Sequence, residues 1–124
     1  MLKTKKGNVF SVIIIFIVLS CSGVEKQQDK PLKKVSINMV THGQATDPFW
    51  SVVSNGAKDA AKELGIDFYY QSPQNFDMIT MSQIIDAVVS TNPDGIIVSV
   101  PDVAALKKSI LAASKKNIPI IVIN

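Results

Sequence analysis

The chain has 124 residues, of which 47% are hydrophobic, and a formal net charge of +3 with one His and one Cys. This length supports one small domain, so a multidomain enzyme is excluded. A single Cys also excludes an intramolecular disulfide, and no group of Cys and His residues has the spacing of metal ligands, so we expect neither a metal nor another cofactor.

The excess of positive charge comes from the beginning of the chain. All basic residues are Lys, and Lys3, Lys5 and Lys6 precede a long apolar run. The rest of the sequence contains equal numbers of Lys and acidic residues, and no Arg. Nucleic-acid binding needs a basic surface and commonly uses Arg to contact bases, so the sequence predicts no nucleic-acid partner.

Residues 1–20 have the features of an export signal. A basic segment is followed by the uncharged apolar stretch Val9–Leu19, which is shorter than the roughly 20 residues that a membrane-spanning helix needs. Val18-Leu19-Ser20-Cys21 then resembles the lipobox of bacterial lipoproteins, which implies that Cys21 becomes a lipidated N-terminus. The alternative is a free Cys in an ordinary signal peptide.

Residues 21–33 are polar and contain little that could be buried. We therefore predict a flexible tether that joins the lipid anchor to a folded domain at residues 34–124. Such an anchor would hold the exported domain at a membrane, in the periplasm or at the cell surface.

The folded part begins with a strand pattern at Lys34–Val40. Asp47 and Pro48 then suit the N-cap and first position of a helix, which Gly65 ends. Apolar and small residues recur at helical spacing in this segment, and we expect their stripe to be buried; it consists of Phe49, Val52, Val53, Gly56, Ala57, Ala60, Ala61 and Leu64. The later elements are predicted at Ile66–Tyr70 (strand), Asp77–Thr91 (helix), Ile96–Val100 (strand), Asp102–Asn117 (helix) and Ile118–Ile123 (strand).

Strands that alternate with helix-length connections predict an α/β fold with a doubly wound parallel sheet. We expect the strand order 2-1-3-4. The strand at Ile118–Ile123 is apolar on both faces and would leave its outer edge unpaired. This pattern favours a chain that is the N-terminal part of a longer protein.

In such sheets, ligands bind beyond the carboxyl ends of the strands, where the strand order reverses. The candidate residues there offer polar groups for hydroxyls and flat rings for the C–H face of a sugar; they are Thr41, Gln44, Asp47, Phe49, Trp50 and Asn124. Asp47 could also be only a helix cap, and one ring could belong to the core. We expect His42 to face solvent or to form a local hydrogen bond.

No motif of a nucleophilic or phosphate-binding enzyme is present, so the sequence does not favour catalysis. The segments VSINMVTHGQATDPFWSVVSNGAKDAAKELGIDFYYQ, NPDGIIVSVPD and NIPIIVIN resemble the N-terminal lobe of type I periplasmic sugar-binding proteins. The resemblance covers roughly residues 35–124. Transferred by position, it implies ligand contacts from Asp47, Phe49, Trp50 and Asn124.

The resemblance implies a two-lobed receptor, monomeric at full length, that binds a sugar or polyol and delivers it to the permease of an ABC importer. The alternative is a receptor that reports to a chemotaxis or two-component sensor. The effector lobe of LacI-type repressors is similar too, but a signal peptide stands here in the place of their DNA-binding helices.

Overall fold

The computed structural model describes residues 33–44 and 46–124. The predicted signal peptide, Cys21 and all of the predicted tether except Lys33 lie outside the described residues. Within the described ranges, no helix has both the length and the apolar character needed to cross a membrane.

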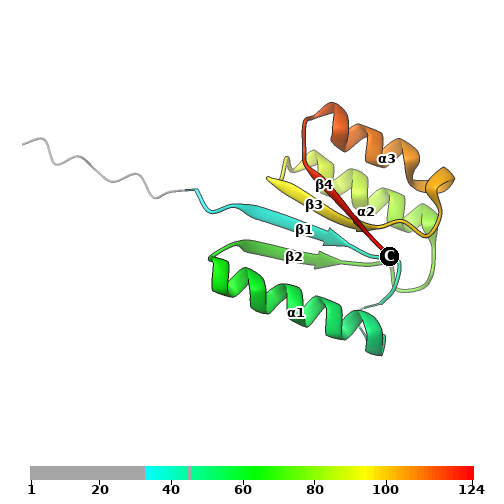
Figure 1. Cartoon of the computed structure of the whole chain (residues 1–124). Coiled ribbons are helices and arrows are strands. Elements are labelled where there is room, and N and C mark those ends of the chain that lie inside the picture. Colours follow the sequence, from blue (N-terminus) through cyan, green and yellow to red (C-terminus); the bar gives the residue numbers. More distant parts are fainter. Residues whose placement is uncertain (1–32, 45) are drawn as a thin grey trace, which may run out of the picture. The chain divides into compact units, whose positions relative to one another are not determined.

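Strands and helices alternate along the folded chain (Figure 1). They are β1 (Ser36–Val40), α1 (Pro48–Leu64), β2 (Asp67–Gln71), α2 (Met78–Ser90), β3 (Gly95–Ser99), α3 (Val103–Lys115) and β4 (Ile120–Ile123). Each predicted element is present, with bounds that differ by a few residues. β4 starts after Pro119, which has no N–H to donate to a neighbouring strand.

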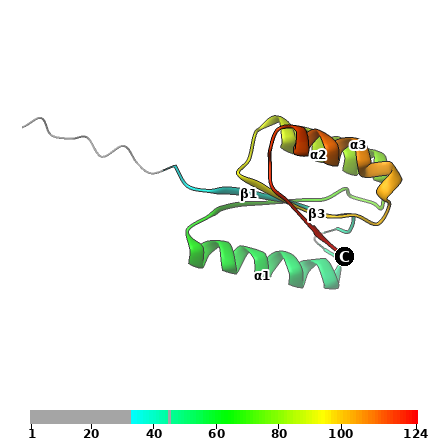
Figure 2. The ribbon, with the colours of Figure 1, turned by 45° about the horizontal axis from the view of Figure 1, so that its top comes forward.

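The four strands form one parallel sheet in the order β2-β1-β3-β4, as predicted. Helix α1 covers one face of the sheet, and α2 and α3 lie together on the other face (Figure 2). The carboxyl ends of β1 and β3 are adjacent, because Val40 is in register with Val98. The loops that follow these two strands therefore begin next to each other.

Short polar side chains set the start of each helix. Asp47, Asp77 and Asp102 accept hydrogen bonds from backbone N–H groups in the first turns of α1, α2 and α3. Gly65 ends α1 with φ 67°, and Asn117 follows α3 with φ 57°. Both residues take the left-handed conformation that suits a helix exit.

The main core lies between the sheet and the pair α2 and α3. It consists of apolar side chains from β1, β3, these two helices and the segment before β4, and its largest fully buried members are Met81, Ile85, Leu106, Val40 and Val98. Aliphatic side chains of this size each contribute roughly 1.5–3 kcal/mol when removed from water. This core fixes the positions of the strand ends from which the site is built.

The face of α1 that packs on the sheet differs from the prediction. Its buried residues are Trp50, Ser54 and Ala61, whereas Phe49, Val52 and Leu64 are exposed. The helix is turned so that the indole of Trp50 and two small side chains meet the sheet. The predicted stripe was therefore wrong in these three positions but right at Ala61, because the helix is turned toward Trp50 and Ser54, which lie outside that stripe.

Two large apolar side chains of β4 are exposed. Ile121 and Val122 are 60% and 59% exposed, although neighbouring residues in a strand point to opposite faces. β4 pairs with β3, and no strand within the described part of the chain pairs with its other edge.

Candidate functional site

The loop after β1 is held in place by a buried hydroxyl cluster. Thr41 is completely buried, and its Oγ1 lies 3.0 Å from the carbonyl oxygen of Gly43 and 2.6 Å from the hydroxyl of Tyr70. The Tyr70 hydroxyl is also 3.2 Å from the same carbonyl. Because two hydroxyl hydrogens serve three contacts, one hydroxyl donates to the carbonyl while the other donates to its neighbouring hydroxyl. The cluster ties the loop to β2.

Gly43 gives the indole of Trp50 the space that it occupies. A Cβ built on Gly43 would overlap the Cδ1 and Nε1 atoms of Trp50. The indole is 5% exposed and forms the inner wall of a pocket. The close approach of ring and backbone therefore requires glycine at this position for steric reasons.

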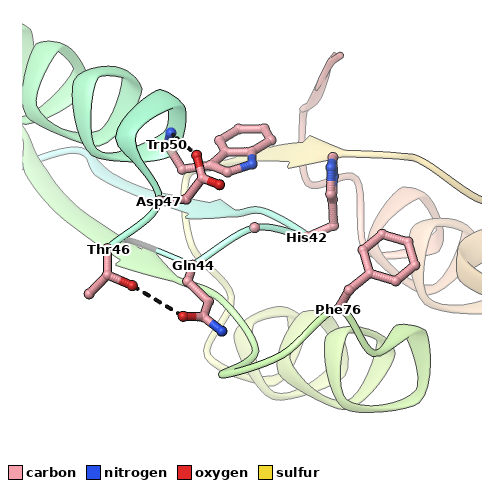
Figure 3. Close-up of a pocket in the computed structure, with 7 residues that line it drawn as sticks. His42, Gln44, Thr46, Asp47, Trp50 and Phe76 are labelled. Carbon is pink, nitrogen blue, oxygen red and sulfur yellow. Dashed lines mark hydrogen bonds between the residues drawn. The ribbon is translucent and has the colours of Figure 1, made fainter.

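A pocket of about 470 Å³ opens at this end of the sheet. Its walls come from the loop after β1, the start of α1 and the segment before α2 (Figure 3). It is lined by His42, Gly43, Gln44, Thr46, Asp47, Trp50 and Phe76. The lining thus combines a carboxylate and an amide with aromatic rings, and it contains no Lys.

Asp47 combines a structural role with a place in the pocket. Its Oδ1 accepts hydrogen bonds from the backbone N–H groups of Phe49 and Trp50, at 2.8 and 3.4 Å. No hydrogen bond to Oδ2 is found among residues 33–44 and 46–124. One oxygen therefore caps the helix, and the second is available to accept a hydrogen bond from a ligand.

Gln44 and Thr46 face each other on the outer side of the pocket (Figure 3). The hydroxyl of Thr46 donates to Oε1 of Gln44 at 3.1 Å. This contact occupies the amide oxygen and leaves the NH₂ group of Gln44 as a donor.

Three rings form an edge-to-face series across the pocket. The ring centroid of His42 is 5.0 Å from that of Trp50 and 5.7 Å from that of Phe76, with interplanar angles of 82° and 81°. Such T-shaped pairs are favourable because the positive edge of one ring meets the negative face of the next. His42 is also bonded to Ser99 at the end of β3, through its backbone N–H and its Nδ1, each at 2.9 Å.

The structure brings three of the predicted site residues together: Gln44, Asp47 and Trp50 line the pocket. Thr41 lies buried beneath it, and the exposed ring of Phe49 packs edge-to-face on Trp50 outside the lining. Asn124 follows β4, is exposed and has a φ of 54°. It does not line this pocket.

Sequence reasoning did not select His42, Gly43, Thr46 or Phe76 as site residues. His42 was expected to face solvent or to bond locally, but its partner Ser99 is distant in the sequence and lies on β3. Phe76 precedes the cap of α2, in the connection after β2. The sequence predicted ligand contacts only from the loops after the first, third and fourth strands, and Phe76 lies in none of these.

Comparison with known proteins gives a consistent set of relatives. Residues 37–124 match the family described as the periplasmic binding protein domain. No curated protein sequence matches the chain.

Among solved structures, a periplasmic sugar-binding protein of an ABC sugar transporter from Legionella pneumophila is 36% identical, with a TM-score of 0.69; the match covers 72% of this chain and 33% of that one. A carbohydrate transporter from Acidothermus cellulolyticus in complex with myo-inositol is 33% identical, with a TM-score of 0.68 and coverage of 74% and 32%.

GanP, a glucose-galactose binding protein from Geobacillus stearothermophilus, is 29% identical, with a TM-score of 0.69 and coverage of 73% and 32%. The chain thus spans about a third of the length of each of these three structures.

Proposed function

The chain belongs to the periplasmic binding protein family, and on that premise we propose that it binds a simple sugar or polyol outside the cytoplasm for delivery to an ABC importer. The family consists of binding proteins and not of enzymes. The proposed action is therefore capture and release of an unchanged solute.

The observation that carries the proposal is Oδ2 of Asp47, which has no hydrogen-bond partner among the described residues, beside the indole of Trp50 in one pocket. A sugar hydroxyl can donate its hydrogen to this carboxylate, while the apolar C–H groups of the sugar pack on a ring. Myo-inositol in the structure from Acidothermus cellulolyticus has the same combination of hydroxyls and C–H groups.

The charges around the pocket argue against an anionic ligand. Asp47 is a lining residue, and no Lys lines the pocket to balance a second carboxylate or a phosphate. Two like charges in one partly enclosed site repel each other. A neutral solute with several hydroxyls fits these groups best.

In this proposal the chain supplies one wall of the binding site, and a second lobe closes over the sugar about a hinge. The permease of the importer is the proposed partner of the closed form. Cys21 would carry a lipid and hold the monomeric receptor at a membrane, in the periplasm or at the cell surface, with residues 21–33 as the tether.

The proposal is tested by titrating the chain with neutral pentoses, hexoses and polyols while indole and backbone N–H signals are recorded by NMR. D-galactose and D-galacturonate form a matched pair that differs in charge. We expect neutral solutes to shift signals of the pocket and the charged one to shift them less. If no neutral sugar or polyol perturbs Trp50 at millimolar concentration, the proposal is wrong.

A further inference from the structure

Ser99 and His42 form a hydrogen-bonded pair. The positions of its hydrogens follow from the numbers of donors and acceptors in the pair. The backbone N–H of His42 can only donate, so Oγ of Ser99 accepts this bond. The hydroxyl of Ser99 then has one hydrogen left, and Nδ1 of His42 is the only acceptor found for it within the described ranges. Ser99 is completely buried, and a buried hydroxyl hydrogen without an acceptor would be costly.

The hydroxyl hydrogen of Ser99 therefore lies between Oγ of Ser99 and Nδ1 of His42. Nδ1 must then be unprotonated, because it accepts this hydrogen. In the neutral imidazole the remaining hydrogen is on Nε2, which becomes a donor.

Nε2 of His42 is also accessible. Every buried side-chain nitrogen and oxygen among the described residues has a hydrogen-bond partner. Nε2 has none in the same part of the chain, so it is not buried; the same reasoning applies to Nε1 of Trp50. Both rings line the pocket, where they stand edge-to-face (Figure 3).

From these relationships we propose that Ser99 fixes the tautomer of His42 so that the Nε2–H group donates a hydrogen bond to a ligand hydroxyl oxygen in the pocket. The proposal rests on the proposed function for its ligand, and it adds two residues to that site. His42 contacts the ligand, and Ser99 is a positioning residue that acts through His42. Trp50 and Phe76 hold the imidazole plane between them.

The donor complements the free carboxylate oxygen on the other side of the pocket. Asp47 can only accept hydrogen bonds from a ligand, whereas the Nε2–H of His42 can only donate one. A hydroxyl group can donate to the first and accept from the second, and a polyol can do both with neighbouring hydroxyls. Asp47 and His42 together therefore favour hydroxyl compounds over ligands that can only accept hydrogen bonds.

The tautomer can be measured without any ligand. His42 is the only His of the chain, so long-range ¹⁵N–¹H spectra of the full chain contain one imidazole. In the neutral ring, recorded at a pH of about 8, we expect Nε2 to be protonated and Nδ1 to have the shift of an unprotonated ring nitrogen. Ser99→Ala should produce a mixture of tautomers. Ser109→Ala removes another completely buried hydroxyl, on α3, and should leave the spectrum unchanged.

The ligand contact is tested with myo-inositol and D-galactose as probes. The NMR signal of Nε2 of His42 should shift when the probe is added. His42→Phe, which keeps an aromatic ring in place, should weaken binding of the probe about 5- to 10-fold. Ser99→Ala should weaken it by a smaller factor of roughly two to three, in line with the mixed tautomer.

The outcomes separate this inference from the proposed function. Protonated Nδ1 in the wild-type spectrum would overturn the inference whether or not sugar binds. Shifts at Trp50 and Asp47 with none at His42, or equal affinity of His42→Phe, would overturn the ligand contact and leave the sugar site intact. A spectrum without any shift in the pocket would overturn both the proposed function and the contact.

Discussion

The indole of Trp50 lies over Gly43 so closely that the glycine has no room for a side chain. We expect Gly43→Ala to push the ring out of its position and to destabilise the chain by about 1–3 kcal/mol, as overpacking does elsewhere. Trp50 is the only Trp, so its fluorescence reports the displacement directly. Thermal unfolding measures the loss of stability.

The control for this change is Gly56→Ala. Gly56 lies in α1, and a Cβ there meets no atom within 4 Å. The substitution should stabilise the helix by about 0.5–1 kcal/mol and leave the fluorescence unchanged. If both variants have the same unfolding temperature and emission spectrum as the wild type, the contact between Gly43 and Trp50 is unimportant.

Asp47→Asn separates the two roles of the carboxylate. Asn caps helices about as well as Asp, so stability should change by less than about 0.5 kcal/mol. A charge-assisted hydrogen bond of ~1.5–3 kcal/mol to the ligand would be lost, which corresponds to a roughly 10- to 150-fold weaker affinity for a sugar. Calorimetry or NMR titration gives the ratio. Asp102→Asn changes a cap outside the pocket and should bind as the wild type does, so equal losses in both variants would contradict the assignment.

Asp94 links the sheet to the turn before β3 and makes stability depend on pH. The backbone N–H of Ser36 donates to its Oδ2 at 2.8 Å and Nζ of Lys33 to its Oδ1 at 3.2 Å, and these bonds lower the pKa of Asp94 below its usual value. A carboxyl whose pKa is lowered by folding stabilises the fold above its unfolded pKa. That contribution is lost as pH falls through the lower, folded pKa.

Thermal unfolding of Asp94→Asn between pH 7 and pH 3 tests this dependence. The variant should be less stable than the wild type at neutral pH, and the difference should shrink on acidification. Asp86→Asn alters an exposed carboxylate on α2 and serves as the control. A constant difference between wild type and Asp94→Asn over the whole range would contradict the linkage.

Cys21 lies outside the described residues, and its role is tested in cells. The proposed lipoprotein should incorporate a labelled fatty acid and sediment with membranes. Cys21→Ala should abolish incorporation and leave an unprocessed or soluble product. Absence of label in the wild-type chain would remove the anchor from the proposal without affecting the sugar site.

We expect the exposed apolar side chains of β4 to bind hydrophobic dyes. Ile121, which is 60% exposed on a strand with one unpaired edge in the described part of the chain, should contribute to dye binding and to self-association. Ile121→Lys should reduce both, with little change in stability because the side chain is largely in water. Leu64→Lys, on α1, should change them less. Equal dye fluorescence in the wild type and Ile121→Lys would rule out this strand as the adhesive surface.

The alternation of strands and helices was predictable because local signals agree with one another. Asp47, Asp77 and Asp102 mark the helix starts, and Gly65 and Asn117 mark two exits. The parallel direction of the strands also followed from the helix-length connections between them.

The site was predictable only in part. Phe49 and Trp50 are adjacent rings, and the one that turns inward is decided by the rotation of α1 and by the space above Gly43. Phe76 lies in the connection after β2 and Ser99 at the end of β3, so no local pattern connects them with His42. Tertiary packing alone determines these contacts.

Helix α1 packs on its face of the sheet through few fully buried side chains, namely Trp50, Ser54 and Ala61. Two of these are small, so Trp50, which lines the pocket, is also the largest buried side chain of the helix. Local opening of α1 would therefore carry away a wall of the pocket, and a bound solute would oppose that opening. Amide hydrogens of α1 should accordingly exchange with deuterium faster than those of α2 in the free chain, and slow down selectively when a solute is bound.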